Sequence, residues 1–322
     1  MHSLFAVHVK GLAKLAVLAV LVMGGGVYAA APVATFAESK TLALQIALDR
    51  RGFSCNTIDG QWGAKSQVAL ATYCAIHGYA VPPTPEIARD ILFPREPNLF
   101  RIETVTQREH DALVRIPATP EGKAALKAMG YETIMEMYAE RGHLTEGALR
   151  RLNPGVAWPN PPVGTRVKIP DFVFANGQDA RSARVKASVL RVTLSRFEIT
   201  AFDEKGRLIA LFPCSIAADK AKLPPEGELQ VTTIIPHPDY TYTPDRVARG
   251  GRIVRRLFPP GPNNPVGSSW MGLTLPGYGI HGTPKPETIG RAESHGCFRL
   301  ANWNAIRLRK MCETGTSVVV EK

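Results

Sequence analysis

The stretch Ser294-His295-Gly296-Cys297-Phe298-Arg299-Leu300 carries the strongest signal in this 322-residue chain. His281 lies sixteen residues before Cys297, within the segment Ile280-His281-Gly282-Thr283-Pro284. Cysteine hydrolases and transferases need a thiolate nucleophile, an imidazole that carries the proton, and backbone N–H groups that face an oxyanion. The two segments together supply such a set of groups.

Cys297 has neighbours that suit a nucleophile. A free thiol has a pKa of about 8.5 and attacks poorly until a nearby base or cation makes it a thiolate. Gly296 allows a close backbone approach and places an N–H beside the sulfur, where an oxyanion forms. His295 and Arg299 each lie two positions away, so on an extended segment they point to the same face as Cys297. We expect a second imidazole near the thiol, and an arginine that pairs with a substrate carboxylate.

His281 follows a short apolar strand, Tyr278-Gly279-Ile280, and a strand end is a rigid place from which to present a base. Taken singly, each site residue has an ordinary structural role as a buried cysteine, a core histidine or a surface arginine. Because these residues occur together in one short segment, separate structural roles explain them less well than a shared catalytic site. A zinc site of His281, His295 and Cys297 is a further alternative. The chain has no Cys-x-x-Cys or His-x-x-x-His spacing, so we rank a metal below a nucleophile.

Several segments of the C-terminal half resemble the L,D-transpeptidase (YkuD-like) catalytic domain. The resemblance covers about residues 184–322 and rests on Pro225-Glu226-Gly227, Pro238-Asp239-Tyr240-Thr241-Tyr242-Thr243-Pro244, Gly261-Pro262-Asn263-Asn264-Pro265-Val266-Gly267, His281-Gly282-Thr283, Ile289-Gly290 and the 294–300 stretch. Phe298 stands where the family more often has a smaller aliphatic residue. The resemblance implies a mostly-β catalytic domain that acts on peptidoglycan stem peptides.

The resemblance also implies a reaction and a role for each site residue. The family cuts the L,D bond before the terminal D-Ala of a tetrapeptide stem, holds the acyl group as a cysteine thioester, and passes it to an amine. When the amine belongs to a neighbouring stem, the product is a 3–3 cross-link of the cell wall. No cofactor and no metal are implied. The implied catalytic residues are Cys297 as nucleophile, His281 as general base, and His295, Gly296 and Ser294 in the nucleophile loop and oxyanion hole. The implied substrate-binding residues are Arg299, Tyr278 and Gly282, whose carbonyl orients His281.

Other functions use the same residues or none of them. Water as the acceptor gives an L,D-carboxypeptidase or a hydrolase, and a protein lysine as the acceptor attaches a protein to peptidoglycan. A non-catalytic cell-wall-binding protein would act through its N-terminal modules alone. The acceptor depends on pocket shape and water access, which the cysteine and histidine set does not reveal.

The N-terminus is typical of an export signal. Lys10 and Lys14 precede the apolar run 15–23, and a Gly24-Gly25-Gly26 segment then leads to Ala29-Ala30-Ala31. A basic start, a short apolar run and an Ala-x-Ala-like site describe a secretory signal peptide. A membrane-spanning helix needs about 20 apolar residues, and the apolar run 15–23 is shorter than that. We therefore expect residues 1–31 to be cleaved off rather than kept as an anchor. An uncleaved anchor is the alternative. Export predicts a periplasmic or cell-envelope protein with no stable membrane insertion after cleavage.

The chain is basic. Removal of residues 1–31 leaves 291 residues and takes away two lysines, so the net charge falls from +11 to +9. A basic surface suits an acidic partner. An exported protein rarely meets nucleic acid, so we exclude nucleic acid and expect peptidoglycan stem peptides and glycan as partners. A charge that serves only solubility is the alternative.

Five cysteines in an exported protein predict disulfides and at least one unpaired thiol. Cys55 and Cys74 lie close together in one predicted helical unit and form the first candidate pair. Cys214 and Cys312 form the second candidate pair. These pairings leave Cys297 free, as a nucleophile requires.

Two small modules are predicted before the catalytic domain. Residues 38–80 contain two expected helices around the turn Asp59-Gly60 and resemble a helical peptidoglycan-binding module, although the same residues also suit a plain helical hairpin. Residues 81–119 begin with a proline-rich segment and are expected to be a linker. Residues 120–172 resemble a small α/β LysM-like module with the turn Asn153-Pro154-Gly155. Its usual Gly-Asp-Thr opening is absent, so a spacer is the alternative.

From about residue 184 the pattern becomes strand-like. Apolar residues recur with near alternation over 185–202, and turn residues separate further short apolar runs. One helix is expected after Asn302. The predicted fold class is therefore multidomain α+β, with a mostly-β domain at 184–322.

Overall fold

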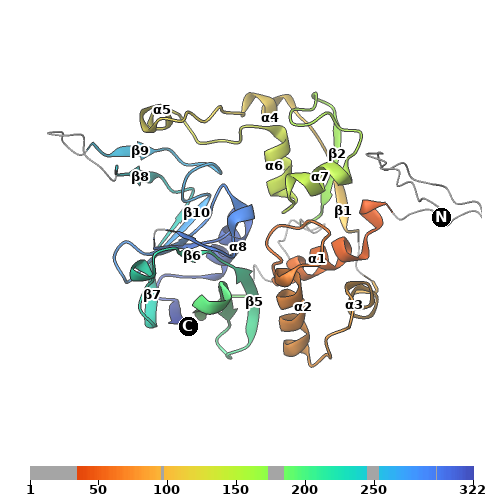
Figure 1. Cartoon of the computed structure of the whole chain (residues 1–322). Coiled ribbons are helices and arrows are strands. Elements are labelled where there is room, and N and C mark those ends of the chain that lie inside the picture. Colours follow the sequence, from red (N-terminus) through yellow and green to blue (C-terminus); the bar gives the residue numbers. More distant parts are fainter. Residues whose placement is uncertain (1–34, 96–97, 173–184, 245–253, 295) are drawn as a thin grey trace, which may run out of the picture. The chain divides into compact units, whose positions relative to one another are not determined.

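The computed structural model describes residues 35–95, 98–172, 185–244, 254–294 and 296–322 (Figure 1). The predicted signal peptide, residues 1–31, lies outside the described residues. Residues 35–322 form one compact unit. Within the described part, no helix has both the length and the apolar character needed to cross a membrane.

Three helices follow one another at the start of the described chain, namely α1 (Lys40–Arg50), α2 (Ala64–His77) and α3 (Pro85–Leu92). Ser39 caps α1 by accepting a hydrogen bond from the N–H of Leu42, and α2 ends at Gly78, which adopts a left-handed φ of +69°. The two helices predicted within residues 40–78 are therefore present. Their shared apolar residues form a small core of their own.

Gln45 on α1 holds the turn Asp59-Gly60 of the region that resembles a peptidoglycan-binding module. Its buried side-chain amide donates to Asp59 Oδ1 at 3.1 Å, to the Gln61 carbonyl at 2.9 Å and to Ser66 Oγ at 3.0 Å. Its amide oxygen accepts from the N–H of Gly60 at 2.8 Å. The motif residues thus hold the turn between α1 and α2 together. Peptidoglycan binding by this region stays a prediction.

The next region combines a two-stranded sheet with short helices. Strands β1 (Phe100–Thr104) and β2 (Arg166–Pro170) pair antiparallel, and between them lie α4 (Gln107–Asp111), α5 (Pro120–Ala124), α6 (Ile134–Arg141) and α7 (Glu146–Leu152). The structure differs here from the linker predicted over 81–119, which contains α3, β1 and α4. The partner of β1 is more than sixty residues away, so no local pattern reveals the pairing.

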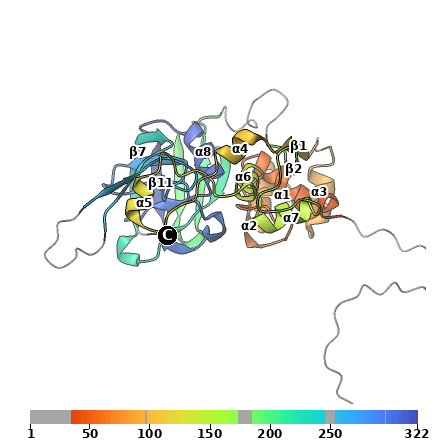
Figure 2. The ribbon, with the colours of Figure 1, turned by 90° about the horizontal axis from the view of Figure 1, so that it is seen from above.

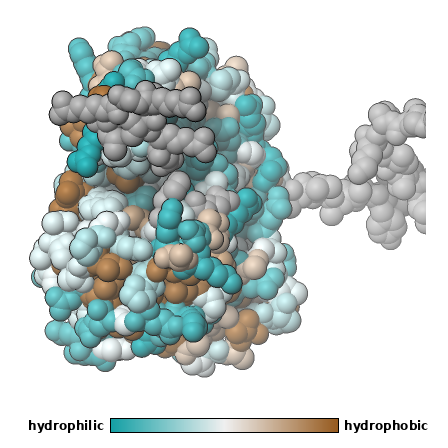
Figure 3. Space-filling model, turned by 60° about the vertical axis from the view of Figure 1, so that its left-hand side comes forward, coloured by the Kyte–Doolittle hydropathy of each residue, from teal (hydrophilic) through white to brown (hydrophobic). Residues whose placement is uncertain are grey.

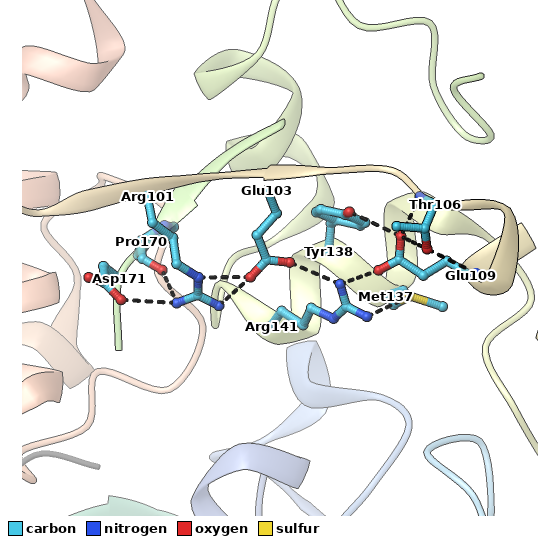
Figure 4. Close-up of polar contacts among 9 residues, drawn as sticks. All are labelled: Arg101, Glu103, Thr106, Glu109, Met137, Tyr138, Arg141, Pro170 and Asp171. Carbon is cyan, nitrogen blue, oxygen red and sulfur yellow. Dashed lines mark hydrogen bonds and ion pairs between the residues drawn. The ribbon is translucent and has the colours of Figure 1, made fainter. Parts of the chain in front are cut away.

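Ion pairs join the elements of this region (Figure 4). Arg101 on β1 contacts Glu103 at 2.7 Å and Asp171 at 3.2 Å. Arg141 on α6 contacts Glu103 at 2.9 Å and Glu109 on α4 at 2.5 Å. Each arginine bridges two carboxylates, and Glu103 bridges both arginines. The chain of charges fixes α4 and α6 against β1.

An eight-stranded sheet forms the centre of the C-terminal region, in the order β13-β11-β10-β7-β14-β3-β4-β5. Its strands are β3 (Val189–Thr193), β4 (Glu198–Phe202), β5 (Leu208–Pro213), β7 (Gly227–Pro236), β10 (Ser269–Leu273), β11 (Gly279–His281), β13 (Phe298–Arg299) and β14 (Ser317–Glu321). The pairs β11–β13 and β14–β3 are parallel and the other pairs are antiparallel. The prediction of a mostly-β domain is confirmed.

Helix α8 (Asn302–Met311) begins where the sequence places it, after the nucleophile stretch. Ala305, Leu308 and Met311 recur every three residues and are buried in the sheet's core. Burial of this apolar stripe fixes α8 against the sheet, near β10 and β11. The helix therefore lies next to the strand that carries His281.

Shorter elements complete this region. Strands β6 (Ile216–Ala217) and β12 (Ala292–Ser294) pair parallel, while β8 (Tyr240–Tyr242) and β9 (Arg256–Phe258) form an antiparallel ribbon. Helix α5 lies beside this ribbon in Figures 1 and 2, and Glu121 pairs with Arg256 at 3.2 Å. The face in Figure 3 shows hydrophobic residues in separate patches among hydrophilic ones.

The N-terminal helices contact the edge of the sheet through backbone groups. The N–H of Leu211 on β5 donates to the Gly52 carbonyl at 2.9 Å, and the N–H of Ser54 donates to the Leu211 carbonyl at 3.0 Å. This bridge covers part of an edge strand that otherwise offers unpaired backbone groups. The side chain of Arg307 on α8 also donates to the carbonyls of Asp49 and Arg50.

Candidate active site

A cleft of about 570 Å³ lies over the end of the sheet that carries β11 and β13. Residues from the predicted nucleophile stretch line it together with residues from β7, β8, β10 and the loop before β10. The lining residues are Ile235, Pro238, Asp239, Tyr240, Thr241, Pro265, Val266, Trp270, Gly277, His281, Ser294, Gly296, Cys297 and Arg299. The structure thus brings five residues of the predicted site, His281, Ser294, Gly296, Cys297 and Arg299, into one cavity.

Cys297 lies in the short loop between β12 and β13. Buried Ser294 holds this loop, because its hydroxyl donates to the Cys297 carbonyl at 2.6 Å and accepts from the N–H of Gly296 at 3.2 Å. Gly296 has a φ of +153°, a conformation that residues with a side chain rarely adopt. The half-buried thiol donates to the Gly277 carbonyl, with a sulfur-to-oxygen distance of 3.6 Å.

His281 is the last residue of β11, and its neighbours fix it on both sides. It pairs with Trp270 on β10 and with Arg299 on β13, so three site residues come from adjacent strands. The Trp270 ring stacks on the imidazole, with ring centroids 5.5 Å apart and planes inclined by 19°. Nδ1 of His281 lies 2.6 Å from the Gly282 carbonyl. A carbonyl can only accept, so Nδ1 carries the proton and Nε2 keeps its lone pair.

Burial makes the histidine and the cysteine neutral at rest. The His281 side chain is only 4% exposed, and burial lowers the pKa of His281 to about 4, with Arg299 lowering it further and Gly282 partly opposing the shift. Burial also raises the pKa of the Cys297 thiol, and a backbone hydrogen bond from Gly279 and the charge of Arg299 only partly offset it. Among the described residues no hydrogen bond joins the thiol to the imidazole. The site therefore holds a neutral base and a protonated thiol.

Arg299 brings a positive charge to the cleft wall. Its backbone exchanges two hydrogen bonds with Ser215, at 2.9 and 3.0 Å, which fixes the direction of the side chain. Its Nε atom is buried and has no partner among the described residues. A carboxylate that enters the cleft can satisfy this group.

The remaining predicted site residues have different places. Gly282 presents its carbonyl to His281, as expected for a glycine that has no side chain to orient the imidazole. Tyr278 does not line the cleft; its hydroxyl donates to the Lys222 carbonyl at 3.0 Å, and its ring lies close to Gly296. Tyr278 thus contacts the back of the nucleophile loop. His295 lies outside the described residues.

Two features of the site were missed from the sequence. Trp270 was expected only as a strand residue, and its stacking on His281 depends on the pairing of β10 with β11. Asp239 lies in a motif of the family resemblance, but nothing in that motif predicted that its carboxylate lines the cleft. The sequence signal for Trp270 is its place six positions before Pro276-Gly277, on a strand that this turn can pair with the next one.

All five cysteines are free thiols in the structure, which therefore differs from the predicted pairs Cys55–Cys74 and Cys214–Cys312. Each predicted pair nevertheless falls within one apolar cluster. Burial raises the pKa of all four of these thiols, and to about 12 for Cys312, so they are poor nucleophiles. Cys297 is the least buried of the five.

No group of three histidine, cysteine, aspartate or glutamate side chains that could hold a metal ion occurs in the described part of the chain. His295, which the zinc alternative needs, is not among those residues. The described cleft lining brings together the thiol of Cys297, the imidazole of His281 and the guanidinium of Arg299.

Comparison with known proteins agrees with this chemistry. Residues 187–320 match the family model of the L,D-transpeptidase catalytic domain, YkuD. A Bacillus licheniformis protein provisionally named L,D-transpeptidase YkuD is 27% identical over 186 residues, which are 58% of this chain and 92% of that protein. A Bacillus subtilis protein provisionally named L,D-transpeptidase YqjB is 34% identical over 112 residues, 33% of this chain and 57% of that protein.

Among solved structures, an L,D-transpeptidase from Mycobacterium smegmatis is similar to this chain with a TM-score of 0.34 and 16% sequence identity. The matched part is 42% of this chain and 59% of that chain. This chain thus spans less than two thirds of the mycobacterial protein. The mostly-β domain carries a cleft that contains a cysteine and a histidine. Residues 187–320 match an L,D-transpeptidase catalytic domain, of a family that acts on peptidoglycan.

Proposed function

We propose that this protein is a peptidoglycan L,D-transpeptidase that forms a thioester between Cys297 and a tetrapeptide stem, releases D-Ala, and passes the acyl group to an amine to give a 3–3 cross-link. One observation carries the proposal. The thiol of Cys297 and a neutral imidazole of His281, fixed in one tautomer by the Gly282 carbonyl, line the same cleft.

The acylation step follows from the neutral resting pair. Nε2 of His281 takes the thiol proton as Cys297 Sγ forms a bond to the stem carbonyl carbon. The tetrahedral intermediate then collapses, the bond to the D-Ala nitrogen breaks, and the imidazolium gives its proton to that leaving amine. The acyl group stays on Sγ. In the second step an acceptor amine attacks the thioester, His281 takes a proton from the amine, and the thiol is regenerated.

The nucleophile loop offers one clear donor for the oxyanion. The N–H of Gly296 is already engaged by Ser294 Oγ. The N–H of Cys297 has no hydrogen-bond partner among the residues that the structure describes. We assign the Cys297 N–H to the oxyanion and Gly296 and Ser294 to the shape of the loop.

The charges of the cleft favour an amine over water as the acceptor. Arg299 provides a cation and Asp239 a carboxylate on the described cleft lining. A stem peptide carries carboxylates that suit Arg299, and an acceptor ammonium suits Asp239. An L,D-carboxypeptidase or hydrolase has no need of the second group. Attachment of a protein lysine would use the same carboxylate, and the product assay below separates it.

The regions before the catalytic domain are proposed to hold the enzyme on its insoluble substrate. Residues 38–80 supply a peptidoglycan-binding-like module and residues 120–172 a LysM-like module, and tethering raises the effective concentration of the domain at the wall. Retention of the full-length Cys297→Ala protein on insoluble peptidoglycan tests this role, because the variant cannot be captured covalently. A protein that stays in the supernatant has no such role.

The proposed reaction takes place in the periplasm or cell envelope. Residues 1–31 are proposed to be a cleaved signal peptide, and a family that acts on peptidoglycan fits that compartment. N-terminal sequencing of the exported protein tests the cleavage. A start within residues 1–14 on the membrane-bound protein would instead mean an uncleaved anchor.

Incubation with purified tetrapeptide muropeptides, followed by mass spectrometry, tests the activity. We expect dimers with 3–3 linkages and free D-Ala from the wild type, and neither from Cys297→Ala. Tripeptide products without dimers would mean hydrolysis. Dimers formed equally by Cys297→Ala would refute the proposal.

A further inference from the structure

The loop at residues 259–268, which joins β9 to β10, is held by the region that precedes the catalytic domain. The N–H of Met129 donates to the Pro260 carbonyl at 2.9 Å, and the N–H of Asn263 donates to the Met129 carbonyl at 3.0 Å. A Cβ atom on Gly261 would lie 2.1 Å from that Met129 carbonyl, so only glycine permits the approach. Two residues of this loop, Pro265 and Val266, line the active-site cleft. The contact is thus built into the backbone beside the cleft.

Two carboxylates of α6 extend the contact. Glu136 accepts a hydrogen bond from the side chain of Asn263 at 2.7 Å. Glu140, one turn further along α6, accepts from the side-chain nitrogen of Asn302 at 2.9 Å. Asn302 is the first residue of α8 and is completely buried. A side chain from outside the catalytic domain therefore reaches a buried polar group within it.

Asn302 lies directly behind the backbone that holds the catalytic histidine. Its Oδ1 accepts from the N–H of Ser268 at 3.1 Å, and its Nδ2 also donates to the Pro262 carbonyl at 3.1 Å. Cβ atoms on Gly267 and Gly282 would lie 2.1 and 2.3 Å from Oδ1, so these glycines pack tightly against the amide. Gly282 is the residue whose carbonyl fixes Nδ1 of His281.

We propose that Glu140 is a positioning residue for the acyl transfer: through Asn302 it fixes the backbone of Gly282 and hence the imidazole of His281. The reaction itself rests on the proposed function, but the positioning of His281 relative to Cys297 does not. The region before residue 184 is then a part of the active-site architecture as well as a tether.

The carboxylate of Glu140 has further polar neighbours besides Asn302. The Tyr131 hydroxyl donates to its other oxygen at 2.8 Å. Arg141, the next residue, pairs with Glu103 and Glu109 instead, as Figure 4 shows. Glu136 is the other carboxylate nearby. Burial therefore raises the pKa of Glu140 to about 7, while the bonds from Asn302 and Tyr131 partly oppose the shift.

Three variants test the positioning role. Glu140→Ala removes both acceptors, Glu140→Gln keeps an amide oxygen for Asn302, and Glu103→Ala is the matched control. Glu103 is a partly buried carboxylate of the same region whose partners, Arg101 and Arg141, lie outside the catalytic domain. We expect Glu140→Ala to lower kcat on a tetrapeptide donor about tenfold with KM within about twofold, because a small misplacement of the base affects the chemical step. Glu140→Gln and Glu103→Ala should keep kcat within about twofold of the wild type.

A second readout needs no peptidoglycan substrate. The rate at which iodoacetamide alkylates Cys297, followed by peptide mapping, should fall about tenfold near neutral pH in Glu140→Ala. The difference should vanish at alkaline pH, where the thiolate forms without help from His281. A wild type that is inactive on tetrapeptides but shows this alkylation difference would refute the proposed function and leave the positioning role standing.

The role is refuted if Glu140→Ala keeps the wild-type alkylation profile, or if Glu103→Ala loses as much kcat and reactivity as Glu140→Ala. Should Glu140→Ala fail to fold, Glu140→Asp replaces it. The shorter side chain keeps the carboxylate but withdraws it from Asn302, and it should show the same loss near neutral pH. Wild-type behaviour of a folded Glu140→Asp would equally overturn the proposal.

Discussion

Two histidines of this protein, the buried His281 and the partly buried His143, differ in the group that faces Nδ1. His281 contacts a backbone carbonyl at 2.6 Å, whereas His143 contacts the carboxylate of Asp49 at 2.7 Å. Both rings stack on a tryptophan, Trp270 for His281 and Trp303 for His143. A carbonyl accepts a hydrogen bond from Nδ1 and so fixes the tautomer of the imidazole, while a carboxylate accepts the same hydrogen bond and adds a negative charge beside the ring.

The two histidines also differ in their surroundings. His143 lies between the rings of Phe172 and Trp303, and its ion pair joins α1 to the segment before α7. His281 lines a cleft beside a thiol and has a free Nε2. We therefore propose a structural role for the pair of His143 and Asp49 and a catalytic role for His281, whose Nδ1 faces a carbonyl.

The largest expected effect separates the two histidines by activity. His281→Gln should lower kcat/KM for acylation of Cys297 by about a thousandfold, because a positioned general base contributes a factor of about 10² to 10⁴. His143→Gln should keep kcat/KM within about threefold, because the ring does not touch the cleft. Single-turnover acylation followed by mass spectrometry measures both. Equal losses in the two variants would erase the distinction.

The second effect separates them by stability. His143→Ala removes one of the groups that stabilise the Asp49 carboxylate, which is 0% exposed, and opens a gap between two rings. Loss of one partner of a buried ion pair costs about 3–5 kcal/mol. We expect a fall of about that size in the free energy of unfolding, measured by urea denaturation near neutral pH. A fall below about 1 kcal/mol would mean that the pair is not structurally important.

The two histidines should also respond differently to acid. The pKa of His281 falls from 6.5 to about 4 on folding, so the unfolded chain takes up a proton first and stability is lost as pH falls from about 6.5 to 4. The loss attributable to His281 is about 3 kcal/mol and should be absent from His281→Gln. For the same reason the acylation rate should have no inflection near pH 6.5 and should fall only near pH 4.

The contribution of Asp49 to stability is also lost at low pH, but for another reason. Burial alone raises the pKa of Asp49, but the charge and hydrogen bond of His143 and the charge of Arg307 hold it below its usual value. Its contribution to stability is present above the ordinary aspartate pKa of about 3.9 and is lost as pH falls through the lower, folded value. Unfolding curves of the wild type and His143→Gln, compared below pH 4, check this; parallel curves would contradict it.

The smallest expected effect concerns the acceptor. Asp239→Asn removes the carboxylate of the cleft lining and leaves Cys297, His281 and Arg299 in place. We expect acylation to change by less than about twofold and the ratio of 3–3 dimers to tripeptide to fall by about threefold, since an exposed ion pair contributes about 1 kcal/mol or less. Quantified muropeptide products measure the ratio. An unchanged ratio would remove the argument for an ammonium at this position.

The grouping of the candidate site residues could be predicted because most of them are close in sequence. Ser294, Gly296, Cys297 and Arg299 occupy six positions of one loop and strand, and the prediction that they belong to one site needed only their order. His281 joined them because a strand end presents a side chain rigidly. The mostly-β domain was predicted from the alternation in residues 185–202 for the same local reason.

What could not be predicted depends on partners far away in sequence. Trp270 reaches His281 only through the register of β10 and β11, and Glu140 reaches Asn302 across 162 positions. The segment 81–119 was expected to be a linker because β1 is recognisable only beside β2. Residues 38–80 were compared with a peptidoglycan-binding module and with a plain helical hairpin, and the use of the Gln45 amide inside the fold was not predicted. Local sequence patterns thus predicted which residues group in the cleft, but not the distant residues, such as Trp270 and Glu140, that contact them or the backbone beside them.

The mass of the acyl-enzyme tests directly whether Cys297 forms a thioester with the donor stem. The wild-type protein, mixed with a tetrapeptide donor and quenched in acid, should gain the mass of the donor minus D-Ala, located by peptide mapping on Cys297. Cys297→Ala should gain nothing. No adduct on the wild type, or an adduct on another residue, would contradict the thioester mechanism.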